Sequence, residues 1–144
     1  MQSISFEQIS EGQQLPTLEI DVSTGLIVAT AIASRDYQNV HHDRDQAIAL
    51  GSKDIFMNIL TTNGLIGRFI TDWTGPQGLL QRVNIRLGVP NYAGDKMVLH
   101  GTVKNKRQHR DQGIIDIEVV GKNSMGDHVT GNVEVALPIA GQAH

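Results

Sequence analysis

The sequence contains no cysteine, which excludes disulfide bonds and metal sites built on thiolates. It also lacks a basic excess: 12 Lys and Arg against 15 Asp and Glu leave a net charge of −3, unlike a nucleic-acid-binding surface. No apolar run approaches the roughly 20 residues of a membrane span, and the start of the chain lacks the pattern of a signal peptide. We therefore expect a soluble cytoplasmic protein with neither nucleic acid nor membrane as partner.

The length of 144 residues fits one domain spanning 1–144, large enough to bury a core without disulfide or metal support. No internal repeat, low-complexity segment or Pro/Gly/Ser-rich linker divides the chain.

The first half of the chain contains a strand, an ambiguous apolar run and a polar loop. Residues 18–22 alternate strictly between apolar and polar, which predicts a half-buried strand. Residues 26–33 are mostly apolar, and their periodicity allows either a buried strand or a helix. Residues 34–43 then gather two carboxylates, an arginine and two histidines between apolar flanks, where site chemistry tends to lie.

Two helices are predicted after this loop. Asp43 is a candidate N-cap with Gln46 three residues later, and Gly51 suits the left-handed end of a short helix over residues 44–50. Residues 56–73 form the longest apolar segment, which predicts a helix buried on all sides. Gly64 and Gly67 lie inside it and indicate close approach by a sheet or a second helix.

The second half of the chain has the two-residue period of strands. Apolar residues alternate with polar ones in segments 82–89, 97–103, 115–119 and 129–137, with turn residues between them. Short turns between consecutive strands predict an antiparallel meander. An α+β fold in which this sheet wraps around the apolar helix is the hotdog fold in outline. Its remaining edge strands favour pairing with a second hotdog.

Within the polar loop, Asp36 and His41 are the candidate catalytic residues. Asp43 is better explained as a helix cap, and His42 as a solvated neighbour of His41. The other four histidines are scattered, and no helix carries paired histidines with a carboxylate at metal-ligand spacing, so we expect no metal.

Residues 33–43 resemble the signature of the MaoC-like (R)-specific enoyl-CoA hydratases, in which an aspartate precedes a histidine by five positions. Gln38 and Asn39 stand where that family usually has Asn-Pro. Residues 86–95 resemble the family's strand-and-turn segment, and the likeness runs from about Phe6 to Leu137.

A narrower resemblance lies in residues 51–61 and 71–73, which are similar to the small catalytic subunit of the family's steroid branch. That branch hydrates steroid side-chain enoyl-CoA in cholesterol degradation. Its small subunit pairs with a second MaoC-like chain that lacks the acid and histidine. Met57 and Asn58 replace the His-Gly of the general family, as they do in the steroid branch.

The resemblance implies an enoyl-CoA hydratase, a hydro-lyase whose coenzyme A belongs to the substrate and which needs no further cofactor. Asp36 and His41 would then be the acid/base pair, with the formal base unassigned. Asn58 matches the family's oxyanion glycine, which implies a role for its main-chain N–H; its side chain could add a donor or simply cap the helix.

The sequence does not identify the residues that bind the phosphates of coenzyme A. Residues 104–110 form a basic run that could meet phosphates across a subunit boundary, although a solvated hairpin end is the preferred explanation. Arg68 and Arg82 are further candidates.

Three other functions compete with a steroid hydratase. One is a homo-oligomeric (R)-specific hydratase of medium-chain fatty enoyl-CoA. Another is a non-catalytic acyl-CoA-binding hotdog subunit, which would have no need of both Asp36 and His41. A hotdog thioesterase is disfavoured, because those enzymes usually carry their acidic residue on the central helix and residues 56–69 contain no carboxylate.

Overall fold

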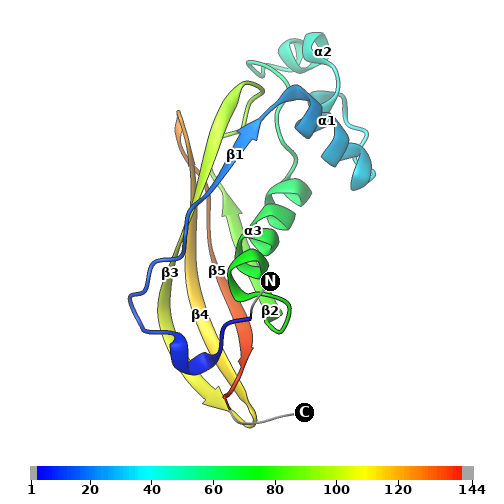
Figure 1. Cartoon of the computed structure of the whole chain (residues 1–144). Helices are drawn as coiled ribbons and strands as arrows, with labels where there is room; N and C mark the ends of the chain where they lie inside the picture. Colours follow the sequence, from blue (N-terminus) through cyan, green and yellow to red (C-terminus); the bar gives the residue numbers. More distant parts are fainter. Residues whose placement is uncertain (1–2, 141–144) are drawn as a thin grey trace.

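A five-stranded antiparallel sheet curves around the helix α3 (Figure 1). The structure is a computed structural model, and it describes residues 3–140. The strands lie in the order β1-β3-β4-β5-β2. Their bounds are β1 (Leu18–Val22), β2 (Leu79–Leu87), β3 (Asp95–His109), β4 (Gln112–Asn123) and β5 (Gly126–Pro138).

The helices lie at one face and one end of this sheet. They are α1 (Thr24–Ala33), α2 (Arg44–Ala49) and α3 (Ile59–Thr74), with short 3-10 turns η1 (Phe6–Gln8) and η2 (Asn39–His41). Figure 1 shows α3 along the sheet, while α1 and α2 project beyond its upper end. Among the described helices, none is long and apolar enough to cross a membrane.

The apolar run that the sequence left ambiguous is helical. Ser23 caps α1 by accepting a hydrogen bond from the N–H of Leu26, and only Ile27 and Ala31 on this helix are buried. Two buried positions four residues apart define one narrow face, which suits a helix packed on the end of the fold.

The predicted meander is wrong for β2. Strands β3, β4 and β5 do follow one another, but β2 pairs with β5 and not with β3. The connection after Leu87 therefore leads from the β2 edge of the sheet to β3, which lies beside the opposite edge strand β1. Gly88 and Val89 donate hydrogen bonds to the carbonyls of His128 and Asp127 before Pro90 ends the pairing.

Helix α3 begins at Ile59, later than predicted, and its burial is one-sided. Six of its residues are buried against the sheet: Thr61, Thr62, Ile66, Phe69, Ile70 and Thr74. Ile59 and Leu60 are 52% and 54% exposed. Among the described residues, no atom outside the helix lies within 4 Å of a Cβ built on Gly64, so the close approach predicted there does not occur. A Cβ built on Gly67 would lie 3.7 Å from Cδ2 of Leu80, so β2 does approach the helix at that position.

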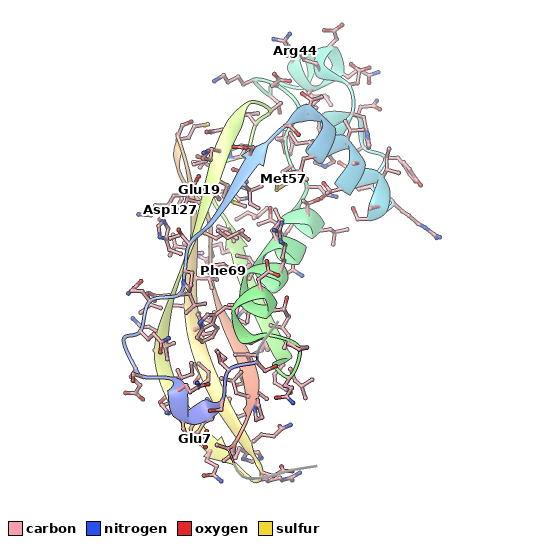
Figure 2. All side chains as sticks on the ribbon, in the orientation of Figure 1. Glu7, Glu19, Arg44, Met57, Phe69 and Asp127 are labelled. Atoms are coloured by element: carbon pink, nitrogen blue, oxygen red, sulfur yellow. The ribbon has the colours of Figure 1, made fainter. Side chains whose placement is uncertain are left out.

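The core fills the space between α3 and the concave face of the sheet. Burying apolar area at about 25 cal/mol per Å² is the main stabilising contribution to such a core. Residues of this core with no more than 2% exposure include Phe69, labelled between α3 and the sheet in Figure 2, and Ile66, Ile70, Met97, Leu99, Ile115, Ile117, Val119, Val133 and Val135.

Gly131 is required where β5 meets β2, because a Cβ there would collide with the carbonyl oxygen of Asn84. We predict that Gly131→Ala lowers the free energy of unfolding of the isolated chain by more than about 2 kcal/mol. The matched variant Gly64→Ala places its methyl group in open space and should raise it by up to about 1 kcal/mol. Urea denaturation followed by circular dichroism measures both, and equal effects of the two variants would contradict the prediction.

Candidate active site

The loop that carries Asp36 starts from a strained helix end. Arg35 has φ of 55°, a left-handed conformation that non-glycine residues adopt at a cost. Its N–H donates to the carbonyl of Ile32, and the N–H of Asp36 donates to the carbonyl of Ala31, both at 2.9 Å. These two bonds form the Schellman end of α1 and fix where Asp36 leaves the helix.

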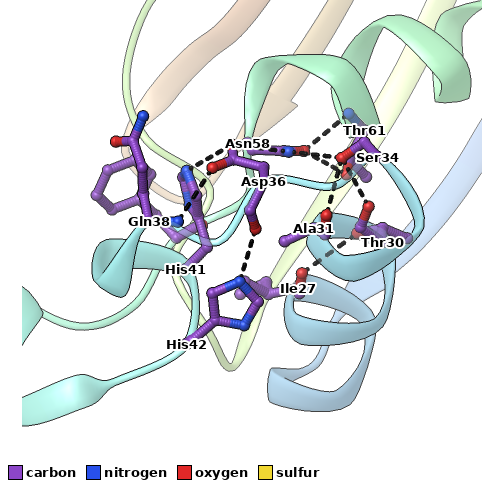
Figure 3. Close-up of polar contacts among 11 residues, drawn as sticks. Ile27, Thr30, Ala31, Ser34, Asp36, Gln38, His41, His42, Asn58 and Thr61 are labelled. Carbon is purple, nitrogen blue, oxygen red and sulfur yellow. Dashed lines mark hydrogen bonds and ion pairs between the residues drawn. The ribbon is translucent and has the colours of Figure 1, made fainter.

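The structure brings together the predicted pair Asp36 and His41 (Figure 3). Nε2 of His41 lies 3.3 Å from Oδ2 of Asp36, and the His41 side chain is nearly buried. On its other side, Nδ1 of His41 lies 2.6 Å from the carbonyl oxygen of Phe56. Because a carbonyl can only accept, Nδ1 carries a hydrogen, and Nε2 is therefore the nitrogen that can gain or lose a proton on the side of Asp36.

Asn58 connects this pair to the start of α3. Its side-chain amide nitrogen donates to Oδ2 of Asp36 at 3.1 Å and to Oγ of Ser34 at 3.0 Å. Its side-chain oxygen accepts from the N–H and the hydroxyl of Thr61, which caps the helix. The side chain is thus both a helix cap and a support for Asp36, and its polar atoms are fully used.

The surroundings of Asp36 favour its ionised form. The amide of Asn58 is the largest cause that holds the pKa of this carboxyl below its usual value, and partial burial opposes it. The N–H of Gln38, which donates to Oδ1 of Asp36 at 3.2 Å, lowers the pKa further, as do the nearby rings of His41 and His42.

His42 is not merely a solvated neighbour, as the sequence suggested. Its Nε2 lies 2.7 Å from the main-chain carbonyl oxygen of Asp36, and the residue is half-buried. It therefore fixes the backbone of the residue whose side chain faces His41. Asp43, by contrast, is the predicted cap: its carboxylate accepts from the N–H of Gln46 at 3.0 Å, and Gly51 has the expected positive φ.

Asp36 and His41 open into a cleft of about 440 Å³. One wall comes from the loop and the start of α3, and the opposite wall from the end of β2 and its crossing segment. The lining residues are Asp36, Gln38, His41, Phe56, Met57, Asn58, Ile59, Leu87, Gly88, Val89, Pro90 and His128. A mostly apolar cleft with a few convergent polar groups suits an organic substrate.

Comparison with known proteins shows clear relatives, although no protein-family model matches the chain. The "3-oxo-4,17-pregnadiene-20-carboxyl-CoA hydratase beta subunit" of Mycobacterium tuberculosis is 49% identical over 126 residues, which cover 88% of this chain and 95% of the relative. A chain in the crystal structure of the M. tuberculosis ChsH1-ChsH2 complex is 48% identical, with a TM-score of 0.82 over 89% of this chain and 98% of that chain.

A MaoC-like dehydratase from Rhodospirillum rubrum shares the fold at only 17% identity, with a TM-score of 0.82 over 97% of this chain and 100% of that chain. The chain belongs to the MaoC-like hotdog hydratase family. The family and the α+β hotdog fold predicted from the sequence are thereby confirmed.

In this MaoC-like chain the candidate sites for coenzyme A phosphates lie outside the cleft. Within the basic run, Lys104 pairs with Glu118, and Arg107 pairs with Asp116 and Glu134. Arg68 pairs with Asp72, and Arg82 lies 3.8 Å from Glu134. These ion pairs support the solvated-surface interpretation, and no group of three or more potential metal ligands occurs between residues 3 and 140.

Sequence reasoning missed His128, which lines the cleft from β5 and is almost fully buried. It is distant in sequence from the loop, so the sequence gives no direct link between the two. Its position within the valine-rich strand 126–138 was the available signal, since a histidine among buried strand residues must find hydrogen-bond partners.

The role of the Asn58 amide can be tested by titration. We predict that Asn58→Ser, which keeps a helix cap but removes the amide, moves the pKa of Asp36 up toward its usual value of 3.8. Because a depressed folded-state pKa stabilises the protein above pH 3.8 and this gain is lost as pH falls through that pKa, the variant should lose less stability on acidification. Carboxyl ¹³C NMR of Asp36 against pH measures the shift.

Ser34→Ala is the matched control for this titration. It removes the other acceptor of the same amide but leaves the bond from Asn58 to Asp36 in place. An equal rise of the Asp36 pKa in both variants would contradict the assigned cause.

Proposed function

We propose that this chain is the catalytic subunit of a steroid side-chain enoyl-CoA hydratase in cholesterol catabolism, and that Asp36 and His41 add water across the 2-ene of the thioester. The observation that carries the proposal is the pairing of Nε2 of His41 with Oδ2 of Asp36, at 3.3 Å, at the edge of the apolar cleft. The 49% identity to a subunit named for such a hydratase supports the substrate class.

The pair is suited to hold the attacking water. When the His41 ring carries no proton on Nε2, that nitrogen and Oδ2 of Asp36 are both acceptors, so they need a hydrogen donor between them. A water that donates one hydrogen to each would satisfy both and direct an oxygen lone pair into the cleft. That arrangement orients the nucleophile toward the β-carbon of a bound enoyl thioester.

The electrostatics favour His41 as the group that takes the proton. The pKa of Asp36 is held low, chiefly by the Asn58 amide, so its carboxylate is a weak base. As the water oxygen bonds to the β-carbon, one water proton passes to Nε2 of His41. The adjacent carboxylate stabilises the imidazolium, which then delivers the proton to the α-carbon.

The start of α3 supplies the donors for the thioester oxygen. Negative charge develops on that oxygen as water adds, and unpaired N–H groups at a helix start are suited to stabilise it. The Asn58 side chain is occupied by Asp36, Ser34 and Thr61, so we assign the role to the main-chain N–H of Asn58.

A second MaoC-like chain is part of the proposal. The ChsH1-ChsH2 crystal structure contains two differently named components, and a chain in it is 48% identical to this one. In this chain alone, an apolar surface of α3 and β2 lies uncovered: Ile59, Leu60, Leu79 and Leu80. A partner seated there would cover apolar area that is costly to expose. Because acyl-CoA thioesters are cytoplasmic metabolites, the proposal places the complex in the cytoplasm.

The acid/base pair is tested by conservative substitution. Asp36→Asn keeps the side-chain shape and His41→Gln keeps a polar side chain of similar size, but both remove the proton-transfer group. Each should lower kcat for enoyl-CoA hydration by about 10²–10⁴-fold. Asp43→Asn and His100→Gln are matched controls, because Asp43 caps α2, asparagine caps as well, and His100 is exposed on β3. Full activity in either site variant would refute the mechanism.

The substrate and the partner are tested together by following the loss of absorbance of the α,β-unsaturated thioester. We expect hydration of 3-oxo-4,17-pregnadiene-20-carboxyl-CoA when the chain is co-expressed with a second MaoC-like chain, and a loss of at least about tenfold without it. Equal turnover of octenoyl-CoA by the chain alone would instead establish a self-sufficient fatty enoyl-CoA hydratase. Binding of both thioesters without turnover would establish a non-catalytic subunit.

A further inference from the structure

His128 occupies a position between the two walls of the cleft. Its ring comes from β5, and its exposure is 2%. Nδ1 lies 2.7 Å from the carbonyl oxygen of Val89, on the crossing segment after β2. Nε2 lies 2.8 Å from the hydroxyl of Thr62, in the first turns of α3. One side chain thus connects the crossing segment to the helix whose start carries Asn58.

The two contacts determine the tautomer of the ring. The carbonyl of Val89 can only accept, so Nδ1 carries the hydrogen. Nε2 of the neutral ring then accepts from the hydroxyl of Thr62. Burial lowers the pKa of His128, which is consistent with a neutral ring. His128 therefore acts through two directional hydrogen bonds, with no ionic contact required.

The segment that His128 holds is the cleft wall opposite the catalytic loop. Gly88, Val89 and Pro90 all line the cleft. Their backbone is also held from β5 and from the end of β4. The N–H of Gly88 donates to the carbonyl of His128, on β5, at 2.7 Å, and the side-chain amide of Asn123, on β4, donates to the carbonyl of Pro90 at 2.8 Å. The bond from Nδ1 to the Val89 carbonyl fixes the middle of the wall.

We propose that His128 is a positioning residue of the hydratase site, whose Nδ1–H holds the Gly88–Pro90 wall at the distance from α3 that seats the thioester against Asp36, His41 and the Asn58 N–H. This inference rests on the proposed hydratase function. Misplacement of a substrate by about 1 Å can cost about 10²-fold in rate, so loss of one wall-fixing bond should be visible in kcat.

Two amide variants separate the donor from the rest of the ring. The nitrogen of an asparagine side chain can occupy the place of Nδ1, whereas a glutamine side chain reaches the place of Nε2. We expect His128→Gln, which keeps only the contact with Thr62, to lower kcat at least tenfold. His128→Asn, which keeps the donor to Val89, should stay within about threefold of the parent. His100→Asn and His100→Gln, on the exposed face of β3, are the matched controls.

The assay uses this chain with its partner chain and 3-oxo-4,17-pregnadiene-20-carboxyl-CoA. An equal fall of kcat in both His128 variants, or a rise in KM with kcat unchanged, would overturn the positioning role in favour of a packing role. The outcome differs from failure of the proposed function, which Asp36→Asn and His41→Gln report independently.

A measurement on the parent protein keeps the proposal testable if the variants fold poorly. ¹⁵N NMR of the His128 ring should show the Nδ1–H tautomer at neutral pH, with slow exchange of its proton. Thr62→Val, which keeps the shape of the side chain, should leave that proton in place, because its acceptor is Val89. Observation of the Nε2–H tautomer in the parent would overturn the inference without any activity assay.

Discussion

The hydrogen bonds of the Asn58 side chain organise the site. One amide joins the end of α1, through Ser34, to the loop carboxylate, and its oxygen caps the central helix. Because the same group sets both the position of Asp36 and the start of α3, the carboxylate and the helix N–H groups have a fixed relation to each other. A nucleophile and an oxyanion site must have such a relation to act on one substrate.

The rest of the loop holds the imidazole in the complementary place. The carbonyl of Phe56 selects the tautomer of His41, and the ring of Phe56 packs edge-on against it at a centroid distance of 5.0 Å. His42 anchors the Asp36 carbonyl from the other side. Supporting contacts of this kind distinguish a catalytic aspartate and histidine from a pair that is merely near in sequence (Figure 3).

Local signals in the sequence predicted local structure well. Asp43 and Gln46 indicated α2, alternation indicated the strands, and the resemblance of residues 33–43 to the MaoC-like signature indicated Asp36 and His41. The pairing of β2 with β5 could not be predicted, because alternation gives the faces of a strand but not its neighbour. The sequence predicted that α3 is buried on all sides. Its composition could not show the one-sided burial, because apolar residues on an exposed face and apolar residues facing the core are of the same types. His128 joins the site only through that unpredicted topology.

The position of β2 also has a consequence for synthesis of the chain on the ribosome. Leu79–Leu87 emerges well before β5, its only neighbour in the described sheet, which begins at Gly126. At typical rates of about 5–20 residues per second, β2 waits seconds for that neighbour. During this time the crossing segment has neither His128 nor a strand to bind, so the cleft wall forms only when almost the whole chain has been made. Contacts so distant in sequence slow folding and leave an open strand exposed to aggregation. The same topology that places His128 in the cleft therefore makes the nascent chain dependent on timely completion.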